Sequence, residues 1–156
     1  MNKKLIYRLI GFWVLNFAAL ALGSIFTRSG VASDWYANLS KAPWEPPGWV
    51  FGAAWTAIMI CFGIYMAYLW PLVENRNMLV RIYAAQLLLN ISWNPIFFYY
   101  HHVLGGLVLI TLLTIIVAIF LFKYRVLLKT KSLLILPYLI WLLIATSLNA
   151  YILFNN

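Results

Sequence analysis

Indole rings, amides and small residues carry most of the chemical possibilities of this sequence. Gly48 and Gly52 are four residues apart, and Trp55 lies seven residues after Gly48, almost on the same face of a helix. Such spacing lets a second helix or a flat ligand approach the backbone closely. Asn90 and Trp93 are three apart and share another face. We expect these groups to stack and to hydrogen-bond.

A second face of this kind lies near the C-terminus. Pro137, Trp141 and Ala145 recur every four residues and place one ring beside one small residue on a proline-bent helix. Together with the residues above, this face indicates an apolar cavity lined by indoles. The alternative is that the rings are membrane anchors or packing residues. Asn90 has two interpretations as well, a contact between helices or a contact with a ligand, because a buried amide needs a partner.

Conventional catalytic groups are scarce. Asp34, Glu45 and Glu74 are the only acids, and all lie at or beyond the ends of the expected helices. This pattern disfavours acid–base hydrolysis and proton-coupled transport, and no phosphate loop or zinc motif is present. The adjacent His101 and His102 are turn residues, haem-iron ligands or donors to lipid headgroups. We expect no metal site and no required cofactor.

The elements that position these residues must lie in a membrane. The chain has 156 residues, of which 65% are hydrophobic and 9% are charged, whereas soluble domains carry about 25% charged residues. The polar side chains are too few to cover a protein of this size in water. The sequence therefore predicts an all-α integral membrane protein.

Runs without charged residues predict five transmembrane helices, because about 20 apolar residues cross roughly 30 Å of hydrocarbon. The run 82–122 has 41 residues and is too long for one crossing, but the turn at 99–106 divides it. We expect one domain over residues 1–156, a bundle of five transmembrane helices with an extramembrane loop at 28–46. The approximate spans are 6–27, 47–70, 80–100, 103–123 and 132–154.

Basic residues are distributed unequally between the two sides of this topology. Arg28 and Lys41 fall on one side, and nine fall on the other: Lys3, Lys4, Arg8, Arg76, Arg81, Lys123, Arg125, Lys129 and Lys131. The positive-inside rule places the N-terminus in the cytoplasm and the C-terminus outside. This asymmetry and anionic lipid account for the net charge of +8, so nothing supports nucleic-acid binding.

Three segments resemble the TspO/translocator protein family, also called tryptophan-rich sensory or peripheral benzodiazepine receptor proteins. They read WEPPGWVFGAAWT at 44–56, LNISWNPIFF at 89–98 and LPYLIWLLIATSLNAYI at 136–152. The segments follow the family's order, and with five spans and a matching length the resemblance covers essentially the whole chain. It implies a five-helix bundle that forms a homodimer, with a pocket beneath the first extramembrane loop.

The resemblance also implies ligands. Those of the family are porphyrins such as protoporphyrin IX and haem, benzodiazepine-type drugs and, in animals, cholesterol. We expect a membrane receptor or sensor linked to tetrapyrrole metabolism, with a porphyrin as ligand or substrate. The matching pocket residues are Trp44, Pro47, Trp49, Phe51, Trp55, Asn90, Trp93, Trp141, Ala145 and Leu148.

Two other functions follow from the same resemblance. In some bacterial relatives two pocket tryptophans, matching Trp55 and Trp141, are implicated in light-dependent degradation of protoporphyrin. A stacked indole can donate an electron to a photoexcited porphyrin. The third possibility is a translocator of porphyrins or other small molecules, which the lack of buried charge and of inverted repeats disfavours.

The chain departs from the family pattern at several positions. Glu45 replaces a small polar residue, which alters the charge of the loop, and Pro95 is expected to bend the third helix beside Trp93. The cholesterol-type pattern requires a basic residue after Tyr151, and none follows; its loose occurrence at 121–129 lies on the basic side. We therefore do not expect cholesterol binding. The charge bias and the absence of a visible transit peptide favour a bacterial plasma membrane.

Overall fold

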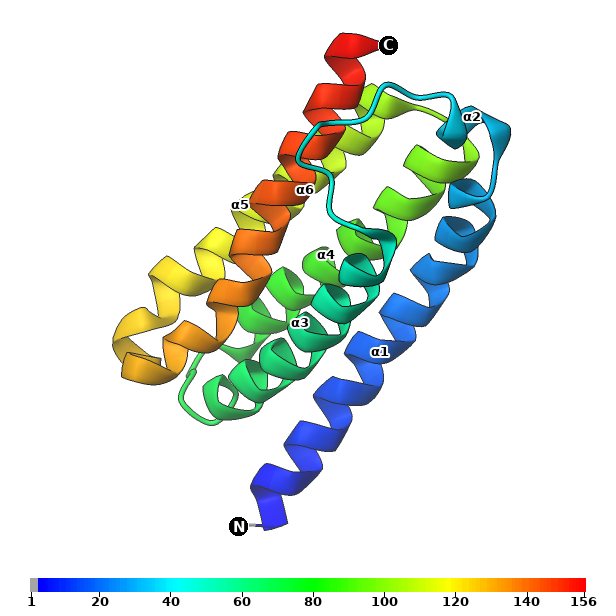
Figure 1. Cartoon of the computed structure of the whole chain (residues 1–156). Helices are drawn as coiled ribbons and strands as arrows, with labels where there is room; N and C mark the ends of the chain where they lie inside the picture. The colour runs from blue at the N-terminus through cyan, green and yellow to red at the C-terminus, as the bar shows by residue number, and fades with distance from the viewer. Residues whose placement is uncertain (1–2) are drawn as a thin grey trace.

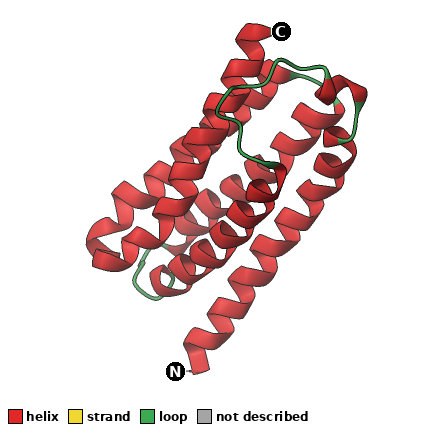
Figure 2. Cartoon of the chain, in the orientation of Figure 1, coloured by secondary structure: helices red, strands yellow, loops and turns green. Residues whose placement is uncertain are grey.

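The computed structural model describes residues 3–156, and these residues form helices, turns and one longer loop, with no strand (Figure 2). Five long helices make up an all-α bundle, as predicted. The elements in chain order are α1 (Lys3–Val31), α2 (Asp34–Ala37), α3 (Gly48–Leu69), α4 (Arg76–Asn94), the π-helix η1 (Pro95–Tyr99), α5 (Val103–Leu128), the 3-10 helix η2 (Lys129–Ile135) and α6 (Leu136–Asn155).

The five long helices pack in a closed ring. Helix α1 lies against α3 and α4, α5 lies against α4 and α6, and α6 returns to α3. The N-terminus and the C-terminus lie at opposite ends of the bundle, and the loop 38–47 crosses the end that holds the C-terminus (Figure 1). Large side chains fill the interior, among them Phe62, Tyr65, Phe120, Tyr138 and Leu142.

The length and apolar composition of several helices agree with those of a membrane protein. By length and composition, three stretches of residues 3–156 are able to cross a membrane: Lys3–Val31, Gly48–Leu69 and Val103–Asn155, the last of which contains α5 and α6. Helix α4 is not among them and is less apolar, since it carries Arg81, Gln86 and Asn90. Its two amides are buried, so the polar face of α4 lies inside the bundle, where partners are available.

The helices extend beyond the charge-free runs from which the spans were predicted. Helix α1 includes Lys3 and ends at Val31, and α5 continues past 123 to Leu128. A charged residue ends the apolar stretch, but the helix continues into the headgroup region, where lysine and arginine are solvated. The loop predicted at 28–46 therefore starts later, and it contains α2, a single turn that was not expected.

Two irregular segments change the expected third and fifth helices. Pro95 lacks an amide donor, and α4 gives way there to η1, so the expected bend takes the form of a π-helix. After η1, His101 adopts a left-handed conformation with φ 52°. The fifth helix begins as η2 at Lys129, which has φ 51°, and becomes α-helical only at Leu136 rather than at 132.

Polar side chains join α1 to its two neighbours. Asn16 is fully buried; its Nδ2 donates to the carbonyl oxygen of Met59 at 3.3 Å, and its Oδ1 accepts from the Tyr83 hydroxyl at 2.6 Å. Trp13 donates from Nε1 to the carbonyl oxygen of Ile60 at 3.1 Å. Its indole lies against Gly63, where any Cβ would overlap the ring. Close packing of α1 on α3 therefore requires glycine at this position.

Substitution of Gly63 by alanine should destabilise the bundle by about 1–3 kcal/mol, because the added methyl group must displace the Trp13 indole. The matched control is Gly11→Ala, since a Cβ at Gly11 meets nothing within 4 Å. The control should leave stability unchanged or slightly raised, because alanine favours helix. Thermal unfolding in detergent, followed by circular dichroism, measures both variants. Equal midpoints for the two would contradict the packing described.

Candidate functional site

Aromatic side chains of α3 and α6 meet edge to face inside the bundle. Phe51 contacts Trp141 with ring centroids 5.2 Å apart and planes at 83°. Trp55 contacts Tyr138 at 6.0 Å and 74°. Each such pair contributes about 0.5–1.5 kcal/mol beyond its buried area. With the neighbouring residues of α4 they form what we call the aromatic site: Phe51, Trp55, Gln86, Asn90, Trp93, Tyr138 and Trp141.

The phenol of Tyr138 connects α6 to α4. Its oxygen accepts hydrogen bonds from Asn90 Nδ2 and Gln86 Nε2, each at 2.7 Å. The exposed fractions of Tyr138, Gln86 and Asn90 are 1%, 0% and 5%. In this structure Asn90 therefore makes a contact between helices, which was one of its two predicted interpretations. These two hydrogen bonds form a polar tie, by which we mean side-chain hydrogen bonds that join different helices, and it fixes the separation of α4 and α6 beside Trp141.

Two polar atoms of the aromatic site have no hydrogen-bond partner in the structure. They are Nε1 of Trp141, a donor, and Oε1 of Gln86, an acceptor. Trp141 is only 6% exposed. Leaving such a group unpaired costs about 1–3 kcal/mol, and buried polar atoms are rarely left without a protein, water or ligand partner. The site therefore has a donor and an acceptor to offer to a bound molecule.

Trp93 joins the aromatic site to η1. Its ring stacks on Phe97 at 5.3 Å with planes at 11°, and its Nε1 donates to Asn149 Oδ1 at 3.3 Å. Asn149 in turn donates from Nδ2 to the carbonyl oxygen of Val103 at 3.1 Å. A Cβ at Gly106 would lie 3.0 Å from both Asn149 and Phe97. This second polar tie holds α4, α5 and α6 together at the outer end.

The loop 38–47 is fastened to the last turns of α6. Trp44 donates from Nε1 to Ser147 Oγ at 3.2 Å, and its ring meets that of Tyr151 edge-on at 5.4 Å. Asn156 Oδ1 accepts from the Ser40 amide at 2.8 Å, and its Nδ2 donates to the Ser40 carbonyl oxygen at 3.3 Å. Trp44 is still 53% exposed. The loop thus covers the end of the bundle through a few polar contacts.

Glu45, the acidic departure in the loop, is held by α2. Its Oε1 accepts from the Tyr36 hydroxyl at 2.8 Å, and Lys41 Nζ lies 4.1 Å from the centroid of the Tyr36 ring. Burial, together with the hydrogen bond and the negative charge of Glu45, raises the pKa of Tyr36. The phenol therefore stays protonated at physiological pH and continues to donate to the carboxylate.

Several predicted residues lie outside the ring contacts of the aromatic site. Trp49 is 75% exposed, and Pro47 is exposed at the N-cap of α3. A Cβ on Gly48 or Gly52 would meet nothing within 4 Å, so no described helix of this chain makes the close approach that their spacing allows. On α6, Ala145 packs against the main core and Leu148 is buried.

Sequence reasoning selected Asn90 but missed the other amides of the interior. Asn16, Gln86 and Asn149 also lie within expected spans and are buried. The requirement that a buried amide find a partner would have identified all of them. Tyr138 gave no such signal, because tyrosine is common near membrane boundaries for other reasons.

The two histidines have structural contacts. His101 stacks on Trp35 at 4.1 Å with planes at 15°, and His102 caps α5 by accepting the Gly105 amide on Nδ1 at 2.8 Å. Residues 3–156 contain no group of three or more His, Cys, Asp or Glu side chains that could hold a metal ion. The contacts favour the interpretation of the pair as turn residues.

Two open surface depressions, of about 510 and 550 Å³, lie at the opposite end of the bundle and are lined by residues within 71–82. None of their lining residues belongs to the aromatic site. In the site itself, Phe51 lies on Trp141 and Trp55 lies on Tyr138. A flat ligand must therefore replace these ring contacts rather than enter one of the open depressions.

Together, the fold and these contacts define a helical integral membrane protein in which α3, α4 and α6 bring aromatic rings and buried amides together inside the bundle. The model of the TspO/MBR family matches residues 12–154, and the chain belongs to this family. The resemblance noted in the three sequence segments is thereby confirmed.

Several relatives match most of the chain. The chain is 38% identical over 137 residues to the tryptophan-rich protein TspO of Chlorobaculum tepidum, covering 86% of each chain. It is 36% identical over 150 residues to the protein of the same name from Archaeoglobus fulgidus, covering 94% of this chain and 92% of the relative. It is 31% identical over 144 residues to the translocator protein of Homo sapiens, covering 90% and 85%.

Substitution of Tyr138 by phenylalanine should destabilise the protein by about 1–3 kcal/mol, because it leaves the Asn90 and Gln86 amides without their shared acceptor. Tyr100→Phe serves as the control, since Tyr100 is 67% exposed. The thermal midpoint in detergent should fall for the first variant and stay within error for the second. A Tyr138→Phe protein as stable as wild type would show that the polar tie contributes nothing.

Proposed function

We propose that this TspO/MBR-family protein is a membrane receptor or sensor that binds a porphyrin, such as protoporphyrin IX or haem, or a benzodiazepine-type molecule in the aromatic site. The observation that carries the proposal is the unpaired Nε1 of Trp141, a donor that is buried in the membrane interior. A ligand with a hydrogen-bond acceptor satisfies this donor. Its ring system takes over the stacking and edge contacts of the surrounding indoles.

A flat, conjugated and largely apolar ligand suits the composition of the site. Phe51, Trp55 and Trp141 supply ring faces and edges, while Asn90 and Gln86 supply a few oriented polar groups. Ligand sites commonly combine an apolar lining with a small number of polar groups in this way. The charge-free interior offers no counter-ion, so the acidic groups of a porphyrin would point toward the loop.

Entry of the ligand requires movement of the loop 38–47. Its fastening consists of the contacts of Trp44 with α6 and the hydrogen bonds between Ser40 and Asn156. Polar contacts of this kind contribute about 0.5–1.5 kcal/mol each, which is small enough for thermal opening. In the proposal, Trp44 and Pro47 line the entrance, and Ala145 and Leu148 line the side formed by α6.

The setting of the protein is also part of the proposal. The distribution of basic residues supports a cytoplasmic N-terminus and an external C-terminus in a bacterial plasma membrane. The family resemblance supports a homodimer. Gly48, Gly52 and Trp49 form an exposed part of α3 that is available to lipid or to a second copy.

A second candidate function is light-dependent degradation of protoporphyrin. It is favoured by the position of Trp55, whose ring lies against Tyr138 in the same site as Trp141. Either indole would then be near enough to a bound, photoexcited porphyrin to donate an electron. In this function Trp55 and Trp141 are the reactive side chains, and the porphyrin is the substrate.

The Trp141→Phe variant should bind protoporphyrin IX about tenfold more weakly in the dark, because it keeps a ring but loses the N–H donor. Quenching of tryptophan fluorescence by protoporphyrin IX in detergent measures the affinity. Trp49→Phe is the matched control and should bind like wild type, since Trp49 lies outside the aromatic site. Unchanged affinity of Trp141→Phe would contradict the proposed binding mode.

Illumination of bound protoporphyrin IX separates the two candidate functions. If the protein degrades the porphyrin, wild type should release a distinct product, and Trp55→Phe should retain binding but lose most of the product. Chromatography of illuminated samples with and without protein provides the measurement. Bleaching at the same rate in both samples would exclude degradation and leave the receptor.

A further inference from the structure

Negative charge is nearly absent from the end of the bundle that carries the N-terminus. Asp34 and Glu45 belong to the opposite end. The nine basic residues in the first two turns of α1, in the first two turns of α4, and from Lys123 of α5 to Lys131 of η2 therefore share the N-terminal end with Glu74 alone. Several of these basic side chains contact aromatic rings rather than carboxylates. Arg76 lies 5.6 Å from the centroid of the Trp70 ring, and Lys131 lies 3.9 Å from that of Tyr68.

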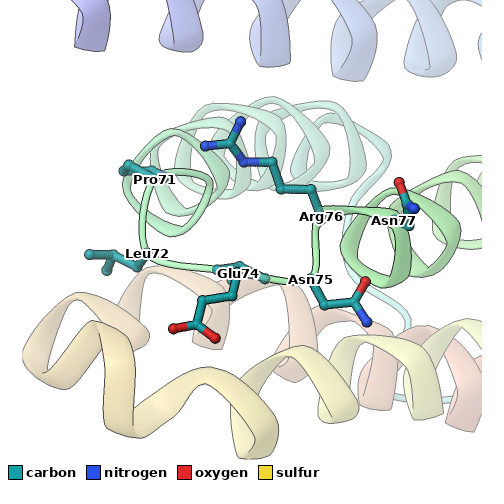
Figure 3. Close-up of a pocket in the computed structure, with 7 residues that line it drawn as sticks. Pro71, Leu72, Glu74, Asn75, Arg76 and Asn77 are labelled. Atoms are coloured by element: carbon teal, nitrogen blue, oxygen red, sulfur yellow. The ribbon is translucent and has the colours of Figure 1, made fainter.

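The two surface depressions lie at this end and adjoin each other at Asn75 and Asn77. In the first, Arg76 and Glu74 point to opposite sides of the connection between α3 and α4 (Figure 3). The second, of about 550 Å³, has no acidic residue in its lining and combines cationic, amide and apolar groups: Asn75, Asn77, Met78, Arg81 and Ile82.

A second cation reaches this second depression from α5. Lys123 Nζ lies 2.9 Å from the sulfur of Met78, a residue of the lining. A thioether is a weak acceptor, and the other contact of this ammonium is the Tyr124 ring at 5.7 Å. Arg81 is exposed, and no carboxylate pairs with it or with Lys123 among the described residues. Two positive groups therefore flank Met78 without a counter-ion.

An apolar surface continues from this position toward the middle of the bundle. Ile119 and Ile115 precede Lys123 by four and eight residues, so the three side chains share one face of α5. Ile119 is 41% exposed, and Ile115 is 50% exposed. Helix α5 packs against α4, so the depression and the apolar strip of α5 are neighbours. Cationic and amide groups at the end of the bundle are followed along the membrane normal by exposed apolar side chains. A phospholipid has the same order, with a polar headgroup followed by acyl chains.

We propose that the depression lined by Asn75, Asn77, Met78, Arg81 and Ile82 binds an anionic phospholipid. Arg81 and Lys123 hold its phosphate and headgroup, and an acyl chain lies along Ile119 and Ile115. Basic pockets between helices at the cytoplasmic surface are suited to such lipids, because phosphate is both anionic and rich in acceptors. This site is separate from the aromatic site and does not depend on the proposed porphyrin function.

Native mass spectrometry of the full chain in a neutral detergent tests the proposal by titration with phosphatidylglycerol and with phosphatidylcholine. Phosphatidylglycerol should bind more tightly, and Arg81→Gln or Lys123→Gln should each weaken it about fivefold. Arg125→Gln is the matched control, since Arg125 is at the same end but two residues from Lys123 and on another face of α5. It should change the affinity about twofold or less.

Three results would overturn the proposal. Equal binding of the two lipids would show that the site does not select negative charge. An equal loss for Arg125→Gln and Arg81→Gln would show that only the diffuse positive charge of this end attracts lipid. Complete displacement of phosphatidylglycerol by millimolar inorganic phosphate would show that the site takes a free anion rather than a lipid.

Discussion

The hydrocarbon region supplies no water to a buried polar group, and this constraint organises the interior of the bundle. Tyr138 accepts from two amides of α4, Asn149 bridges Trp93 to the start of α5, and Asn16 links α1 to α3 and α4. Each of these sets of hydrogen bonds joins different helices, so the polar groups are satisfied only when the helices are packed as observed. The helix with the least apolar composition, α4, takes part in each tie.

Because the hydrocarbon region supplies no water, the two unpaired polar atoms of the aromatic site can be satisfied only by a bound molecule or by movement of the protein. Trp141 Nε1 and Gln86 Oε1 stand out because almost every other buried side-chain donor and acceptor described here has a partner. Their neighbours are aromatic rings held in edge contacts, which another ring system can replace. The loop over this region is fastened by few contacts, whereas the interior is tied by several. A site of this kind can open at its outer end while the rest of the bundle stays closed.

The lipid environment also explains which features were predictable from the sequence. Counting charge-free runs found the five helices, because hydrocarbon imposes their length. It did not give the full length of the helices, since α1 and α5 extend beyond those runs. Asn90 was identifiable as a residue that needs a partner. That partner, Tyr138, lies 48 residues away and was not identifiable. The fastening of Trp44 to Ser147 likewise depends on packing between distant segments, and the exposure of Gly48 and Gly52 depends on which face of α3 turns outward.

The central claim is that the Trp141 indole N–H is held without a partner so that a ligand can accept its hydrogen bond. Proton–nitrogen correlation spectra of the indole groups, recorded in the dark with and without protoporphyrin IX, test this claim directly. The resonance that is absent from Trp141→Phe should move to lower field when the porphyrin binds to wild type. A porphyrin that binds while this resonance keeps its position would contradict the account.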